Sequence, residues 1–135
     1  MDDFIQLENG SIKSVVMDLP FVVKGKDVKY KSMMADRFNC FHTIKELYET
    51  NEDMLKLAHS KLPKKGILIV KTMDLNLGGK QHWIGNFVQN KAEEIGFRMI
   101  DMFVLIAKNK ILTTINEIQK SARKFHSYFF VFERK

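Results

Sequence analysis

An uninterrupted apolar run, Ile67-Leu68-Ile69-Val70, limits the folds open to this sequence. It follows Pro63-Lys64-Lys65-Gly66, a combination of residues that ends helices and forms turns. Such runs are typical of strands that are buried on both faces of a parallel sheet. The run therefore predicts a strand that begins at Ile67, inside a parallel sheet.

Two segments with the apolar spacing of amphipathic helices flank this run. The first follows residue 41, and Thr43 with Glu46 forms a plausible capping box at its start. The second ends at Gly96, where a left-handed cap is common. The apolar positions are Ile44, Leu47, Tyr48, Leu55, Ala58 and Leu62 in the first segment, and Ile84, Phe87, Val88, Ala92 and Ile95 in the second.

Strand signals complete the pattern. We expect strands at residues 12–17, 67–72, 97–107 and 125–132, whereas the polar and basic residues 108–124 fit a short helix or a loop equally well. The order β-α-β-α-β-loop-β predicts one α/β domain over residues 1–135, with helices packed on the faces of the sheet. The first strand has no upstream neighbour to cover its outer edge. We therefore expect that edge to pair with another chain, in a homo-oligomer or with a second subunit.

Composition narrows the class of protein further. The 135 residues are 45% hydrophobic and 28% charged, which is typical of one globular domain. A single cysteine, Cys40, favours a reducing compartment, and the cytoplasm is the expected location. The acidic N-terminus and the absence of an apolar run of ~20 residues argue against a secretion signal and a membrane span. The net charge of +6 favours a polyanionic partner, and the four histidines lack metal-ligand spacing, so no metal is expected.

The tetrapeptide Asp18-Leu19-Pro20-Phe21 directly follows the first expected strand, at the carboxyl end where open α/β sheets bind ligands. An ordinary strand-ending turn would have the same residues. The tetrapeptide also resembles the [Asp/Asn/Ser]-x-Pro-[Tyr/Phe] signature of methyltransferases that modify amino groups of nucleic-acid bases.

This resemblance implies a role for each residue of the tetrapeptide. The exocyclic amine of adenine or cytosine is a poor nucleophile, because its lone pair is delocalised into the ring. Two acceptors aimed at its hydrogens, the Asp18 carboxylate and the Leu19 carbonyl, would favour the pyramidal amine that attacks a methyl sulfonium. Pro20 would hold the Leu19 carbonyl in place, and Phe21 would stack on an extruded base.

Further blocks, in the same order along nearly the whole chain, are similar to proposed DNA methylases of bacteria and phages. They are Phe4-Ile5-x-Leu7-x-Asn9-Gly10-Ser11-Ile12-x-x-Val15-Val16-x-Asp18, residues 64–72, Gly79-Lys80-Gln81-His82-Trp83, residues 92–97 with Asp101-x-Phe103, and residues 122–129. The resemblance implies a class I methyltransferase with S-adenosylmethionine as cofactor. It also implies that the chain is the C-terminal half of its Rossmann-like sheet, an incomplete three-layer sandwich.

One departure from the family concerns the cofactor. Class I methyltransferases bind S-adenosylmethionine at a Gly-x-Gly type of turn, where glycine lets the backbone approach the ligand. None of the seven glycines here forms Gly-x-Gly, so the cofactor-binding residues are unknown. We expect a cofactor-binding half from another polypeptide or a longer protein, or its loss in a decayed gene.

Other polar and aromatic residues are candidates for substrate binding, each with a plainer alternative. His82 and Trp83 could contact a base, or could cap a helix and lie on the surface. Asp74 could line the same cleft or cap a turn. Arg123, Lys124 and His126 could contact phosphates or form a solvated basic loop. The preferred nucleic-acid loop mixes basic and aromatic residues, namely Lys24, Lys26, Lys29, Tyr30, Lys31, Arg37 and Phe38.

Two functions stay open at this point. The chain could transfer a methyl group to a base amine of DNA, or less favourably of RNA, together with a cofactor-binding half. Alternatively, it could be a non-catalytic Rossmann-like remnant that binds nucleic acid or a partner protein. The intact tetrapeptide favours the enzyme, and the missing glycine turn favours the remnant.

Overall fold

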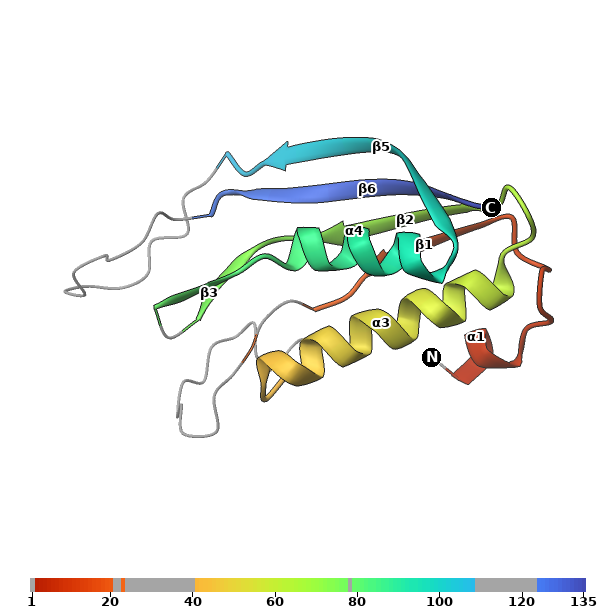
Figure 1. Cartoon of the computed structure of the whole chain (residues 1–135), viewed down its shortest axis with the longest axis horizontal. Helices are drawn as coiled ribbons and strands as arrows, with labels where there is room; N and C mark the ends of the chain where they lie inside the picture. Colours follow the sequence, from red (N-terminus) through yellow and green to blue (C-terminus); the bar gives the residue numbers. More distant parts are fainter. Residues whose placement is uncertain (1, 21–22, 24–40, 78, 109–123) are drawn as a thin grey trace.

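The computed structural model describes residues 2–20, 23, 41–77, 79–108 and 124–135 (Figure 1). The helices and strands follow in the order α1 (Asp2–Gln6), β1 (Ser14–Asp18), α3 (Ile44–Lys61), β2 (Ile67–Thr72), β3 (Leu75–Leu77), β4 (Lys80–His82), α4 (Ile84–Ile95), β5 (Phe97–Ile106) and β6 (His126–Arg134). Within these described ranges no helix is long and apolar enough to cross a membrane. The expected order of strands and helices is confirmed, with α1 and the β3–β4 pair added.

The main sheet has four strands in the order β1-β2-β6-β5. β1 and β2 are parallel, with Ser14 opposite Ile67 and Asp18 opposite Lys71, and α3 lies in the connection between them. β6 runs antiparallel to both β2 and β5. The carboxyl ends of β1, β2 and β5 and the start of β6 therefore meet at one edge, which we call the carboxyl edge.

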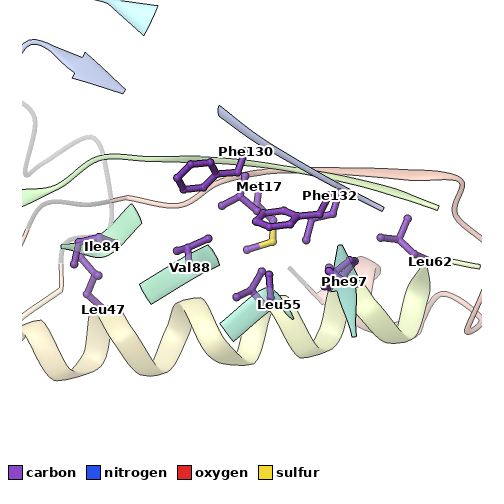
Figure 2. Close-up of a cluster of buried hydrophobic side chains, with 13 residues drawn as sticks. Met17, Leu47, Leu55, Leu62, Ile84, Val88, Phe97, Phe130 and Phe132 are labelled. Carbon is purple, nitrogen blue, oxygen red and sulfur yellow. The ribbon is translucent and has the colours of Figure 1, made fainter. Parts of the chain in front are cut away.

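The hydrophobic core lies on one face of this sheet. Register pairs Met17 with Val70 and Val70 with Phe130, so these three side chains point the same way, and all three are buried. Figure 2 shows Met17 and Phe130 gathered with apolar side chains of α3 and α4, and Figure 1 shows both helices on the same side of the sheet. Core residues from the helices include Leu47, Leu55, Ile84 and Val88, each of them buried.

The ends of both helices follow the expected capping. Thr43 is the N-cap of α3, where its hydroxyl accepts a hydrogen bond from the Glu46 N–H at 3.1 Å and completes a capping box. Gly96 ends α4 with a φ of 119°, in the left-handed region that favours glycine. Between α3 and β2, a Cβ on Gly66 would lie 2.9 Å from the Pro63 carbonyl oxygen, so that turn also requires glycine.

The other face of the sheet corrects one sequence-based expectation. The run 67–70 was expected to be buried on both faces, but Leu68 and Val70 are buried while Ile67 and Ile69 are only half-buried. Both large helices lie on one side, so the described residues form two layers where helices on both faces were expected. We call the uncovered side the open face. It carries Val16, which is 69% exposed, and Phe103, which is 58% exposed.

β1 lies at the end of the sheet, as expected, and within the described ranges its only strand partner is β2. Three of the predicted strands have shifted boundaries. β1 begins two residues later than predicted and includes Asp18, β5 ends at Ile106, and β6 begins at His126 and continues to Arg134. Most of the undecided segment 108–124 lies outside the described residues.

Candidate active site

The carboxyl edge of the sheet collects the described polar residues that the sequence singled out. Asp18 ends β1, Asp74 follows β2 by two residues, and His126 begins β6. Parallel pairing of β1 with β2 brings the first two to one edge although 56 positions separate them in the sequence. The antiparallel direction of β6 adds His126 to the same edge.

Asp18 lies on the open face and forms an ion pair with Lys71. The Lys71 Nζ donates to the Asp18 Oδ2 at 2.8 Å, and the two residues are register partners. The carboxylate is partly exposed, and a carboxylate has about four lone-pair positions for hydrogen bonds. Asp18 can therefore accept a further donor while Lys71 stays bound. Sequence reasoning missed Lys71, because its role depends on the register of two distant strands.

An apolar groove of about 230 Å³ lies beside this carboxylate. It is bounded by β1, by Phe4 of α1 and by Met54 of α3, and it includes Asp18 and Leu19. Leu19 is also partly buried against the core, and Pro20 is half-buried, so both are fixed by packing as well as by the backbone. The first two residues of the tetrapeptide thus border a small apolar groove, and Phe21 lies outside the described residues.

Asp74 is the most buried of the candidate residues, at 4% exposure, and both of its carboxylate oxygens accept hydrogen bonds. Oδ1 accepts from the Gly85 N–H at 3.0 Å, in the first turn of α4, and Oδ2 accepts from the Tyr128 hydroxyl at 3.3 Å. Negative charge is favourable at a helix N-terminus, and the N-cap Trp83 makes no side-chain capping bond. Asp74 therefore does cap a turn, as one of its two sequence interpretations proposed, and it also contacts a tyrosine of β6.

Tyr128 extends this arrangement to His126. The His126 Nε2 lies 2.9 Å from the Tyr128 hydroxyl oxygen, and the two rings meet edge to face. Burial raises the pKa of the Tyr128 hydroxyl, and the nearby charge and hydrogen bond of Asp74 raise it further. We call Asp74, Tyr128 and His126 the relay, since one chain of hydrogen bonds joins them.

His82 and Trp83 lie near the relay in different settings. The His82 ring centroid is 6.4 Å from that of Tyr48, whose pKa is raised by burial and then by the charge of Asp74. Trp83 is 57% exposed, and the Lys124 Nζ lies 5.5 Å from the centroid of its ring, within the range of a cation–π contact. The structure therefore pairs Trp83 with Lys124, two residues that the sequence had assigned to separate groups.

The remaining candidate residues lie outside the described residues. They are Lys24, Lys26, Tyr30, Arg37 and Arg123, together with Lys29, Lys31 and Phe38. Within the described ranges, no cluster of three or more histidine, cysteine, aspartate or glutamate residues could hold a metal ion.

No protein-family model and no curated protein sequence matches the chain. Solved structures do match it over nearly its whole length. A proposed DNA modification methylase of Thermus thermophilus has a TM-score of 0.62 at 14% identity, over 99% of this chain and 49% of that protein. Its complex with S-adenosyl-L-methionine has a TM-score of 0.63 at 11% identity, with the same coverage.

The PvuII cytosine-N4-specific DNA methyltransferase matches with a TM-score of 0.66 at 17% identity, over 98% of this chain and 45% of that enzyme. The chain shares its fold with one half of these solved methylases. It spans about half the length of the solved methylases that it matches. The α/β, partial Rossmann-like fold expected from the sequence is confirmed, although the described helices α3 and α4 cover only one face of the sheet.

Asp74 gives a direct test of the relay. In a Tyr30→Phe, Tyr48→Phe background, where Tyr128 is the only tyrosine, we expect Asp74→Asn to lower the pKa of Tyr128. The reason is that a nearby negative charge disfavours the phenolate, so its removal eases ionisation. Ultraviolet absorbance during a pH titration measures the shift. Asp101→Asn, at an exposed aspartate of β5, is the control, and an equal pKa in both variants would contradict the coupling.

Proposed function

We propose that the chain is the substrate-side half of an S-adenosylmethionine-dependent methyltransferase that acts on an exocyclic amine of adenine or cytosine in DNA. The single observation that carries this proposal is the position of Asp18-Leu19-Pro20. These residues lie at the carboxyl end of β1, where Asp18 and Leu19 border an apolar groove, in a sheet with the fold of DNA methylases. We treat residues 1–135 as one functional unit.

In this proposal Asp18 accepts a hydrogen bond from the base amine and holds it against the methyl donor. The Leu19 carbonyl is the second acceptor, and Phe21 stacks on the base. Acceptors fixed in advance are most effective where charge develops in the transition state. Before a base binds, Lys71 holds the Asp18 carboxylate on the open face, because their ion pair joins β2 to β1.

The described residues fit only part of a cofactor site. The groove beside Asp18 is an apolar wall lined by residues such as Phe4, Leu19 and Met54, and the sequence has no Gly-x-Gly turn. S-adenosylmethionine would supply the methyl group. We propose that residues outside this chain bind most of the cofactor, either in a second polypeptide or in the remainder of a longer one.

DNA is the proposed nucleic acid, with RNA as the weaker choice. The net charge of +6 suits a polyanion, and both matched proteins are named as DNA methylases. Lys24, Lys26, Tyr30, Arg37 and Arg123 remain predicted contacts from the sequence alone. Cytoplasmic location remains a proposal.

Asp18→Ala tests the proposed chemistry. In an assembly that is competent for methyl transfer, we expect a loss of about 2 to 4 kcal/mol of transition-state stabilisation, as for one lost oxyanion-type contact. The measurement is kcat/KM for transfer of a labelled methyl group to DNA. Asp101→Ala is the matched control, because Asp101 is register partner of Val131 on the open face and is also exposed. Full activity of the Asp18→Ala variant would remove Asp18 from the mechanism.

A non-catalytic remnant is the second candidate function, and the missing glycine turn favours it. Calorimetry with S-adenosylmethionine tests whether the isolated chain has a cofactor site of its own. We expect the isolated chain to show no tight binding, because the proposed cofactor contacts lie outside it. Tight binding would show that residues 1–135 hold a cofactor site of their own, and it would contradict the need for a second half.

The exposed apolar side chains of the open face predict that the chain associates with another chain. Val16, Phe103 and Leu105 are each more than half exposed, and by register all three lie on this face. Covering them would stabilise an assembly by about 1 kcal/mol per side chain, since full burial of such a residue gives roughly 1.5–3 kcal/mol. The uncovered edge of β1 adds unpaired backbone donors and acceptors.

We therefore expect the isolated chain to form a homodimer or higher oligomer, or to require a cofactor-binding subunit. Light scattering at micromolar concentration measures the mass. Val16→Lys should shift the chain toward monomer, whereas Leu7→Lys, at an exposed leucine close after α1, should not. A stable wild-type monomer with a cooperative melt would contradict this expectation.

A further inference from the structure

A second cavity lies at the carboxyl edge, away from Asp18. It has a volume of about 290 Å³ and is lined by Val104, Ile106, Phe125, His126 and Tyr128. Its walls are apolar and aromatic apart from the polar groups of His126 and Tyr128. Ligand pockets of about this size are the smallest that proteins commonly use, so this one suits a single flat ring system.

The relay fixes the hydrogen-bonding character of His126 in this cavity. The Tyr128 hydroxyl has one proton, and it donates that proton to the Asp74 Oδ2, since charged acceptors form the stronger hydrogen bonds. The raised pKa of Tyr128 keeps that proton in place. The hydroxyl oxygen can then only accept from the His126 Nε2, at 2.9 Å, so Nε2 carries the proton. In a neutral imidazole the other nitrogen, Nδ1, is then an acceptor.

We infer that this cavity binds a nucleobase that carries an exocyclic amino group, with the His126 Nδ1 as the acceptor and Tyr128 and Asp74 as positioning residues. Adenine and cytosine present an amino donor on the edge where hypoxanthine and uracil present a carbonyl acceptor. A carbonyl facing Nδ1 would place two lone pairs against each other. The cavity therefore selects amino-bearing bases.

This base is distinct from the one at Asp18. One strand, β2, separates β1 from β6. Asp18 is opposite Lys71 in the register, and Lys71 is opposite Phe129, which lies three residues beyond His126 in β6. Strand spacing and rise then put the two backbones roughly 14 Å apart. Asp18 points to the open face, whereas Tyr128 shares the helix-covered face with Phe130. The cavity would thus hold a neighbouring base of the same strand and add sequence preference to the proposed methyl transfer, on which this inference rests.

Nucleoside binding to the whole chain tests the inference without cofactor or turnover. The probes are adenosine against inosine and cytidine against uridine, each titrated by NMR. We expect the amino-bearing nucleoside of each pair to bind about tenfold more tightly, the effect of one hydrogen bond exchanged for an unpaired acceptor. Nitrogen-15 spectra should show His126 protonated at Nε2.

Three variants test whether the relay causes the preference for amino-bearing nucleosides. His126→Phe keeps a ring in the cavity but should abolish the preference, and Tyr128→Phe should abolish it by freeing the tautomer of His126. His42→Phe, at an exposed histidine before α3, should leave it unchanged. If Tyr128→Phe fails to fold, His126→Phe alone decides the role of His126, and the nitrogen-15 spectrum of the wild type decides the tautomer.

Equal binding within each pair, absence of binding, or a wild-type His126 protonated at Nδ1 would overturn the inference. Its failure is distinguishable from that of the proposed function, because methyl transfer is measured separately. Methylation without nucleoside preference would remove the cavity from recognition and leave Asp18 in place. Preference without methylation would leave the cavity as a base-binding site in a chain of another function.

Discussion

Burial of one face of the sheet by α3 and α4 is the interaction on which the rest of the structure depends. Successive strands contribute residues at the same level, as with Met17, Val70 and Phe130, so a single apolar layer fixes the register of β1, β2 and β6 together. That register places Lys71 beside Asp18 and Tyr128 within reach of Asp74. The polar geometry of the carboxyl edge is therefore set by apolar packing elsewhere in the sheet.

The same packing makes the molecule one-sided. Side chains that alternate along a strand point to opposite faces, so fixing one face fully determines what the other displays. Here the open face displays an apolar centre, including Val16 and Phe103, with the Asp18–Lys71 pair at one end and the Arg98–Glu133 pair at the other. Charged pairs at both ends and apolar residues between them resemble the rim and core of an interface more than an ordinary solvated surface.

The sequence predicted the elements whose signals are local. Thr43 with Glu46 and the glycine at position 96 marked helix ends correctly, because caps depend on residues only a few positions apart. The run 67–72 correctly indicated a strand, but the prediction that both of its faces are buried was wrong. An apolar strand has the same sequence pattern whether one or both of its faces are covered. The β3–β4 pair was missed although Gly78-Gly79 lies between its short strands, a recognised hairpin signal.

The candidate site likewise combines residues that the sequence could single out with contacts that it could not reveal. Asp18, Leu19 and Pro20 could be singled out as candidates because their spacing is local, whereas the residues that contact the candidates are distant in sequence. Lys71 is 53 positions from Asp18, and Tyr128 is 54 from Asp74, so only the pairing of strands could reveal either contact. Phe21 and the basic loop after it keep the status of sequence predictions.

The Asp18–Lys71 pair also gives the site a resting state. Without substrate, the carboxylate already has a cationic neighbour that balances its charge. Under the proposed function, the open face would then not present an isolated negative charge to DNA, and the polymer would not be repelled from the point where its base would dock. Lys71 would act as a local counter-ion that reconciles a carboxylate acceptor with the proposed polyanionic substrate.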